Sequence, residues 1–304
     1  MKFSVVIPSY NRDKVIKRAI DSVLKQTFQD FEIVVVDDGS VDKTKEVVNS
    51  IADKRVKYVY QKNQGATAAR NTGIINSLGY YVSFLDSDDF WHPEMLERQL
   101  QTYESDKEIG WVYTNVQGVR ADGSTFPFGL PLGIHGNCYA EALRQGYIAP
   151  TTVVSAKREA LIKVGLFDVQ LPASQDDDIC FKLAKNYKVG YVPEFMASML
   201  FDPDNRISDN GRKVAKGWWM LWNKYEDDVL DYCGKETLAL HYWECLIRYL
   251  AISDKDMTKQ VLEKYKCVGG KITRMQSLLI GVSLNSGGGI INRILLKMLS
   301  SLRY

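Results

Sequence analysis

The chain has 304 residues, 45% of them hydrophobic and 25% charged, a balance typical of a globular protein with a sizeable core. Lysine and arginine number 39 against 37 aspartates and glutamates, so the net charge of +2 gives no reason to expect a nucleic-acid partner. Five scattered cysteines without a C-x-x-C pair argue against a zinc ribbon or a disulfide scaffold. Because no apolar run reaches the roughly 20 residues that span a bilayer, and Pro8 ends the first apolar run early, we expect a cytoplasmic protein.

Strands and helices are predicted to alternate over the first hundred residues. Short apolar runs predict the strands, and apolar residues at helical spacing predict the helices between them. The predicted strands cover 3–8, 32–37, 56–60 and 80–86, and the predicted helices cover 13–24, 42–52, 66–78 and a segment that starts at Pro93. This alternation indicates right-handed crossovers and an α/β fold with a mostly parallel, doubly wound sheet.

Clustered acids follow two of the predicted strands, at the edge where such sheets bind ligands. Asp37–Ser40 follows the second strand, and Asp86, Asp88 and Asp89 follow the fourth. Turn formation or capping explains the first group as well as binding does, but three carboxylates within four residues repel one another unless a cation or an arginine is near. No Gly-rich nucleotide-binding motif is present, so we expect a diphosphate to be held through Mg²⁺ or Mn²⁺.

The chain resembles the family 2 glycosyltransferases in four segments, SVVIPSYNR (4–12), QTFQDFEIVVVDDGSVD (26–42), NQGATAARNTGI (63–74) and YYVSFLDSDDFWHPEML (80–96). The resemblance is specific over residues 3–115 and fainter to about residue 208. It implies the GT-A nucleotide-sugar-binding fold and transfer with inversion. It also implies a nucleotide-sugar-binding half at 1–115 and an acceptor-binding half at 116–212. The resemblance is absent over the last third, where residues 213–304 are predicted to form a helical extension from their own pattern.

The resemblance implies roles for four residues near the sugar donor. Pro8 and Tyr10 match the loop that lies against the uracil and ribose. Asp38 matches the carboxylate that accepts the imide N–H of the base, and a carboxylate is chemically suited to that donor. Arg70 matches the basic residue near the nucleotide.

The resemblance also implies a metal site. Asp86 and Asp88 match an Asp-x-Asp pair in which Asp88 lies closest to Mn²⁺ or Mg²⁺, and Asp86 lies with the donor. Asp202 stands where many relatives carry a histidine that reaches the metal or the diphosphate. Aspartate is also a ligand for hard cations, so Asp202 is a candidate third ligand, although an Asp-Pro turn explains it equally well.

The segment 164–194 resembles the acceptor half of the family, where a Gln-Asp or Glu-Asp pair opens the helix that carries the general base. Gln175 and Asp176 are the matching pair, so Asp176 is the predicted catalytic base. Asp177 and Asp178 follow directly. Attraction to the positive N-terminus of a helix is the alternative explanation for Asp176, and the favoured one for Asp177.

The C-terminal third is predicted to be helical over residues 214–265. Residues 271–304 then hold five basic residues and no acid, with three glycines at 287–289 as a candidate hinge. Residues 290–304 are amphipathic and basic, which is typical of a helix on an anionic membrane surface, here the inner face of the cell membrane. A helix packed on the domain, or on a second copy to give a homodimer through the C-terminal helices, explains the pattern equally well.

The resemblance implies an inverting, metal-dependent glycosyltransferase that moves a sugar from a nucleoside diphosphate to an acceptor hydroxyl. UDP is the expected nucleoside diphosphate. The implied acceptor is a glycan or lipid-linked glycan of a bacterial cell surface. A sugar-phosphate nucleotidyltransferase is an alternative, but it normally has a Gly-rich basic loop where residues 9–12 read SYNR. A catalytically inactive nucleotide-sugar-binding scaffold is another, and the presence of Asp86, Asp88 and Asp176 argues against it.

Overall fold

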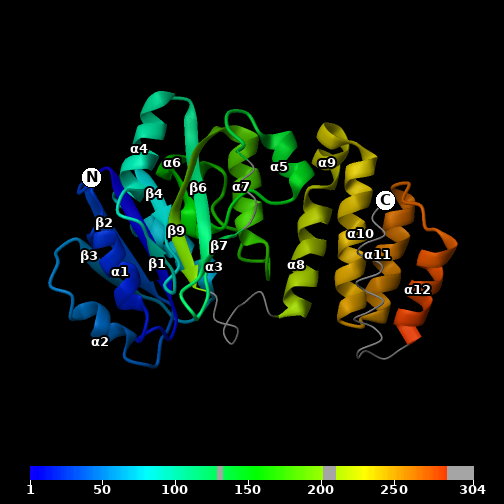
Figure 1. Cartoon of the computed structure of the whole chain (residues 1–304), viewed down its shortest axis with the longest axis horizontal. Helices are drawn as coiled ribbons and strands as arrows, with labels where there is room; N and C mark the ends of the chain where they lie inside the picture. The colour runs from blue at the N-terminus through cyan, green and yellow to red at the C-terminus, as the bar shows by residue number, and fades with distance from the viewer. Residues whose placement is uncertain (129–132, 201–209, 286–304) are drawn as a thin grey trace. The chain divides into compact units, whose positions relative to one another are not determined.

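The computed structural model describes residues 1–128, 133–200 and 210–285 (Figure 1). The described residues form two compact units. The first unit takes 1–142, 147–169 and 175–200, and the second takes 143–146, 170–174 and 210–285. Asp202 and the segment 290–304 lie outside the described residues, and so do the glycines at 287–289.

The first unit is built on a mixed sheet. Its strands are β1 (Phe3–Ser9), β2 (Phe31–Asp37), β3 (Val56–Tyr60), β4 (Tyr81–Phe84), β5 (Phe90–Trp91), β6 (Ile109–Val119), β7 (Thr125–Phe128), β8 (Val154–Lys157) and β9 (Lys188–Leu200). Within the described residues their order is β3-β2-β1-β4-β8-β6-β9-β5, with β7 paired to β6. All pairs among β3, β2, β1 and β4 are parallel, whereas β8 runs antiparallel to both of its neighbours.

Helices pack against this sheet and connect its strands. They are α1 (Ile16–Leu24), α2 (Thr44–Asn49), α3 (Ala66–Asn76), α4 (Met95–Ser105), α6 (Arg158–Lys163) and α7 (Gln175–Asn186), with α5 (Tyr139–Gln145) shared between the units. The α3 helix packs on β1 and β2, and α4 packs on β6 and β9. The buried residues of α1 recur at helical spacing, as Ile16, Ala19, Ile20 and Val23.

The predicted α/β class is confirmed, and the four predicted strands end within two residues of the observed ones. The parallel, crossover-connected part is β3-β2-β1-β4, and the second half of the sheet is mixed. The prediction that Pro93 starts a helix was wrong, because α4 begins at Met95. The carbonyl of Pro93 accepts the amide of Thr27 at 2.8 Å and is therefore taken by another segment.

The parallel strands bring their carboxyl ends to one edge. Ser9 at the end of β1 lies opposite Asp37 at the end of β2, and the amide of Asp38 donates to the carbonyl of Ser9 at 2.8 Å. Val6 of β1 lies opposite Phe84, the last residue of β4, two residues before Asp86. The loops with the clustered acids therefore leave neighbouring strands at the same edge.

The second unit is helical, as predicted for 214–265 (Figure 1). Its helices are α8 (Gly211–Lys224), α9 (Glu226–Cys233), α10 (Lys235–Ala251), α11 (Lys255–Cys267) and α12 (Arg274–Asn285). His241 is buried, stacks on Trp222 with ring centroids 3.6 Å apart, and has its Nε2 2.8 Å from the carbonyl oxygen of Leu143. Burial lowers the pKa of His241 to about 4, so it is a neutral core residue. No helix in the described ranges is long and apolar enough to cross a membrane.

Candidate functional site

The loops after β1 and β2 are fastened to each other. Pro8 is buried within β1 opposite Val36, and Tyr10 follows the strand with 46% of its surface exposed. Asn11, at φ 53°, accepts the amide of Val41 on its side-chain oxygen at 2.9 Å. Its own amide donates to the hydroxyl of Ser40 at the same distance. The exposed Tyr10 ring therefore lies on a loop that is anchored at the next residue, Asn11.

Asp38 is buried and accepts three hydrogen bonds from the next loop. Its Oδ1 accepts from the side-chain amide of Gln61 at 2.7 Å and from the backbone amide of Gln64 at 2.9 Å, while Oδ2 accepts from the amide of Gly65 at 2.7 Å. Gly65 has φ 92°, a conformation that favours glycine. A carboxylate has about four acceptor positions, so about one is left for a ligand. Asp38 therefore shapes the loop at 61–65, a role that the sequence did not reveal.

Arg70 and Asp86 form a partly buried ion pair. Arg70 projects from α3, is 7% exposed, and its Nη2 lies 2.6 Å from Oδ1 of Asp86. Burial on its own lowers the pKa of the Arg70 guanidinium, but the charges of Asp86 and Asp176 raise it overall. The structure thus brings together two residues that the sequence assigned separately to the donor, with Asp176 close enough to act on Arg70.

The carboxylate of Asp88 is more exposed than that of Asp86. The Asp88 carboxylate is 49% exposed and lies 3.7 Å from Nη2 of Arg12, the residue that ends the first predicted binding loop. Arg18 of α1 donates from Nη2 to the backbone carbonyl of Asp88 at 2.6 Å. Both arginines were missed by sequence reasoning, because each contact joins segments about seventy residues apart.

Asn71 joins α3 to the segment before α7. Its side-chain amide donates to the carbonyl of Phe167 at 2.9 Å, and its side-chain oxygen accepts the amide of Phe167 at 3.0 Å. The Phe167 ring packs edge-on against Phe84 of β4 at 5.3 Å and lies 5.8 Å from the Arg70 guanidinium. This clamp connects α3 to the segment that precedes α7.

The three acids at the start of α7 have different surroundings. Gln175 is the first helical residue, as the resemblance implied. Asp176 accepts hydrogen bonds from the hydroxyl of Thr151 and, at 3.2 Å, from the Thr151 amide. Asp178 is fully buried and lies 2.8 Å from the ammonium of Lys182, while Asp177 is also buried. Only Asp176 of the three is part-exposed, which favours it over its neighbours as a group that meets a ligand.

The carboxylates after β4 are chemically suited to a divalent cation that is shared with a diphosphate. No group of three or more His, Cys, Asp or Glu suited to a metal occurs in the parts of the chain that the structure describes. Mg²⁺, however, is usually bound by one or two carboxylates together with substrate phosphates and water. Asp88 offers an exposed carboxylate for this purpose, whereas Oδ1 of Asp86 is taken by Arg70. Asp202 lies outside the described residues.

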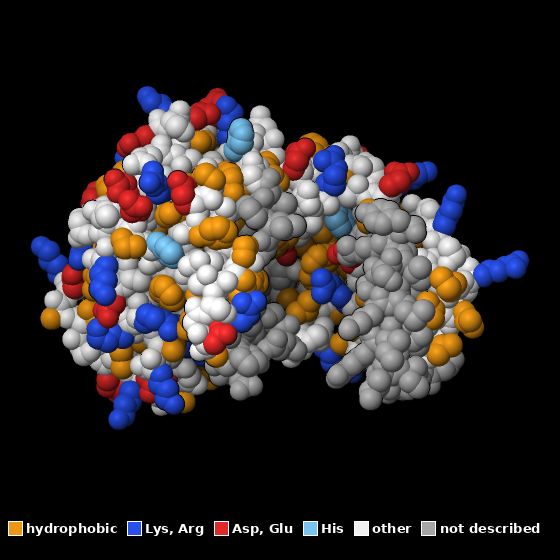
Figure 2. Space-filling model, viewed as in Figure 1, with side chains coloured by type: hydrophobic (Ala, Val, Ile, Leu, Met, Phe, Trp, Pro, Cys, Tyr) orange, Lys and Arg blue, Asp and Glu red, His pale blue; other side chains and the backbone are white. Residues whose placement is uncertain are grey.

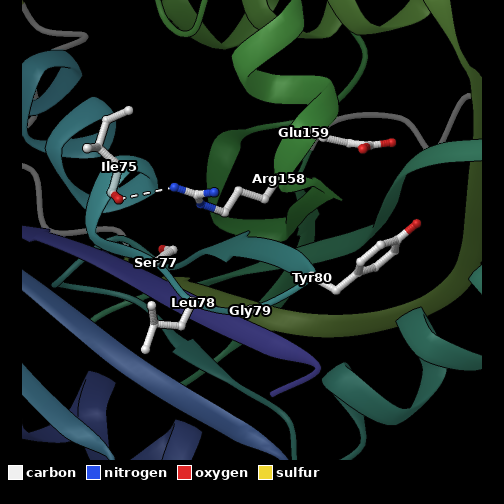
Figure 3. Close-up of a pocket in the computed structure, with 7 residues that line it drawn as sticks. All are labelled: Ile75, Ser77, Leu78, Gly79, Tyr80, Arg158 and Glu159. Carbon is white, nitrogen blue, oxygen red and sulfur yellow. Dashed lines mark hydrogen bonds between the residues drawn. The ribbon is translucent and has the colours of Figure 1, made fainter.

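A pocket elsewhere in the first unit is not the candidate site (Figure 3). It is lined by residues 75 and 77–80, which precede the first residue of β4, and by residues 158 and 159 of α6. Asp86 instead follows the last residue of β4. Arg158 donates to the carbonyls of Ile74 and Ile75 at 3.0 and 3.2 Å. It therefore caps the C-terminal end of α3, which is a sufficient structural reason for a cation there.

Comparison with known proteins identifies the family and the fold of the chain. The model of a family described as "Glycosyl transferase family 2" matches residues 4–164. An uncharacterized glycosyltransferase of Rickettsia felis is 33% identical over 199 residues, which cover 65% of this chain and 33% of the relative. The putative teichuronic acid biosynthesis glycosyltransferase TuaG of Bacillus subtilis is 30% identical over 232 residues, 73% of this chain and 88% of TuaG. The crystal structure of S. aureus TarS in complex with UDP-GlcNAc superposes with a TM-score of 0.71 at 19% identity, covering 100% of this chain and 93% of that one.

These matches define a glycosyltransferase-type α/β domain followed by helices, and the predicted GT-A fold class is confirmed. Since the family match covers more than half of the chain, the chain belongs to the family 2 glycosyl transferases. The chain spans about a third of the length of the first curated relatives.

Proposed function

We propose that this protein is an inverting glycosyltransferase that transfers one sugar from a UDP-sugar to a hydroxyl of a cell-surface glycan or lipid-linked glycan. The observation that carries the proposal is the division of acids around one site, with Asp38, Asp86 and Asp88 after the parallel strands and Asp176 on α7. Family membership supports the class of reaction. The name of TuaG supports a surface polysaccharide as product, and the TarS complex supports a UDP-sugar donor.

The nucleotide is proposed to bind at the ends of β1 and β2. The exposed ring of Tyr10, two residues after the buried Pro8, offers a surface for the base and ribose. The remaining acceptor position of Asp38 suits the imide N–H of uracil. Arg70, which its ion pair with Asp86 holds in place, is proposed as the basic residue near the nucleotide. Donor binding is therefore proposed for the half at 1–115, and acceptor binding for the half at 116–212.

Asp88 is proposed to hold Mn²⁺ or Mg²⁺ together with the donor diphosphate, with Asp86 beside it and Asp202 as a further candidate ligand. A bound cation would offset the negative charge that grows on the leaving UDP. Arg12, 3.7 Å from Asp88, adds a fixed positive charge at the same place. Both features favour departure of the diphosphate.

Asp176 is proposed to be the general base. The acceptor oxygen forms a bond to the anomeric carbon while the bond from that carbon to UDP breaks, and the acceptor proton passes to a carboxylate oxygen of Asp176. The base has to lie away from the leaving group for inversion, and Asp176 comes from a different segment than the donor-side acids. Its two hydrogen bonds from Thr151 leave acceptor positions open for that proton.

The C-terminal helices are proposed to bring the enzyme to the inner face of the cell membrane. Hydrophobic side chains gather on the exposed side of α12 (Figure 2), where Met275, Leu278 and Val282 are 51%, 67% and 41% exposed. Residues 271–304 contain no acid and five basic residues, which suits anionic lipid. Sedimentation with anionic liposomes at low salt and release at high salt is the expected result. A concentration-dependent dimer without liposome binding would instead favour a homodimer through these helices.

A panel of UDP-sugars tests the reaction class. The full chain, incubated with Mn²⁺ and each UDP-sugar in turn, is expected to release UDP slowly from at least one of them, with water as acceptor. Release of a sugar phosphate and UMP, or nucleotide exchange with pyrophosphate, would favour the nucleotidyltransferase. Binding of UDP without turnover of any donor or added glycan acceptor would favour the inactive scaffold.

A further inference from the structure

Two adjacent buried threonines lie between the donor-side and acceptor-side acids of the first unit. Thr151 and Thr152 begin the short 3-10 helix η1 (Thr151–Val153), which leads into β8. They are 1% and 0% exposed, so their polar atoms need partners within the protein. Each finds a partner on a different side of the site.

Thr151 holds both carboxylate oxygens of Asp176. Its hydroxyl donates to Oδ1, and its backbone amide donates to Oδ2 at 3.2 Å. Two donors on separate oxygens fix both side-chain torsions of an aspartate, and these torsions decide where its open lone pairs point. Of the roughly four acceptor positions on the carboxylate, about two stay open.

Thr152 contacts the loop that carries the donor-side acids. Its Oγ1 accepts the amide of Asp86 at 3.3 Å, and its carbonyl accepts the indole N–H of Trp91 at 2.8 Å. These contacts hold the loop at both ends. Because Thr151 and Thr152 share a planar peptide bond, the placement of Asp176 is linked to that of Asp86 through covalent geometry.

We propose that Thr151 is a positioning residue, whose hydroxyl aims Asp176 at the acceptor oxygen and whose link to Thr152 keeps that base in register with the donor loop. The inference rests on the proposed role of Asp176 as the base. The hydroxyl of Thr151 donates a hydrogen bond to Asp176 and takes no proton from the acceptor. Its effect therefore belongs to the rate of transfer and not to donor binding.

Substitution of Thr151 by valine and by serine tests the hydroxyl. Valine keeps the shape and removes the donor, so kcat for UDP release from the UDP-sugar that the wild type hydrolyses fastest should fall about tenfold. The donor KM and the affinity for UDP should stay within about twofold of wild type, because the donor side is untouched. Thr151→Ser should keep most of kcat. Thr114→Val is the matched control, because Thr114 is buried in β6 and its hydroxyl donates a hydrogen bond to the carbonyl of Asn115. This variant should leave kcat unchanged.

A normal kcat for Thr151→Val, or an equal loss in the valine and serine variants, would overturn the positioning role. If Thr151→Val does not fold, Thr151→Ala replaces it in the comparison with the serine variant. A normal kcat for Thr151→Ala would likewise overturn the positioning role. In the Asp176→Asn background, Thr151→Val should cause no further loss. If Asp176→Asn alone keeps full turnover, the proposed base is wrong. If Asp176→Asn is inactive while Thr151→Val is fully active, only the positioning role fails.

Discussion

The two acids after β4 and the acid near the start of α7 are held by different kinds of partner. On the donor side, Asp86 lies 2.6 Å from the guanidinium of Arg70, and Asp88 likewise faces an arginine. On the acceptor side, Asp176 is hydrogen-bonded by the hydroxyl and amide of Thr151, both neutral. The first arrangement pairs each carboxylate with an arginine, and the second fixes the direction of the carboxylate through two neutral donors.

This difference bears on which acid can serve as a base. Inversion needs a base that lies away from the leaving diphosphate, and Asp176 begins α7 whereas Asp86 and Asp88 follow β4. The hydroxyl and the amide of Thr151 fix the direction of the Asp176 carboxylate. We therefore expect substitutions on the donor side to act on binding and charge, and substitution of Asp176 to act on proton transfer.

The largest effect is expected for Asp176→Asn. The amide keeps the size of the side chain but cannot take the acceptor proton, so transfer should fall by about 10²–10⁴-fold, the usual contribution of a positioned base. Affinity for UDP and Mn²⁺, measured by titration calorimetry, should stay near wild type.

Asp178→Asn is the matched variant on the same helix. Asp178 is fully buried beside Lys182, so its substitution should lower the melting temperature and leave the remaining folded enzyme active. Loss of transfer in Asp178→Asn together with an active Asp176→Asn would mean that the base lies two residues later.

A loss of roughly 10³-fold is expected for Asp88→Ala, because a metal-bound diphosphate accounts for several kcal/mol of charge stabilisation. EDTA should silence the wild type, and Mn²⁺ or Mg²⁺ should restore it. Turnover is measured as UDP release at several metal concentrations. Full wild-type activity in EDTA would contradict metal-dependent transfer. Arg12 and Arg70 would then be the proposed positive charges for the diphosphate.

Asp38→Ala should weaken UDP binding by about 1–3 kcal/mol, the scale of a lost hydrogen bond to a charged group. Gln61→Leu is the control, since it removes one donor to Asp38 and leaves the carboxylate in place. It should bind UDP more tightly than Asp38→Ala does. Equal weakening in both variants would show that the order of the loop at 61–65, and not contact with the base, controls affinity.

The second unit should respond to pH in stability and not in turnover. Its His241 has a pKa lowered to about 4 by burial, from an ordinary value of 6.5. Between these pH values the unfolded chain therefore binds a proton that the folded chain does not bind. The free energy of unfolding should fall as the pH drops from 6.5 towards 4, by up to about 3 kcal/mol. His241→Phe should reduce this dependence in urea unfolding at pH 7 and pH 4.5. An unchanged dependence would contradict a buried neutral histidine.

The two sides also differ in how far the sequence could predict them. The donor-side acids stand directly after strands whose apolar runs are easily recognised, so Asp38, Asp86 and Asp88 could be placed at one edge from local pattern alone. The partner of Asp176 could not be found in this way, because Thr151 is 25 residues away and the contact exists only in the folded chain. Arg12 reaches Asp88 over an even longer separation. Local pattern thus predicts where these acids lie, whereas tertiary packing decides which side chain pairs with each of them.

The most direct test of that division uses azide, a nucleophile that attacks without losing a proton. In Asp176→Ala, azide should bond to the anomeric carbon as the bond to UDP breaks, so that no base is needed. UDP release by this variant should rise by about tenfold or more with azide, whereas Asp88→Ala should not be restored, because it lacks a donor-side group. Absence of azide-dependent UDP release in Asp176→Ala, or an equal rise in both variants, would contradict the assignment of Asp176 as the base.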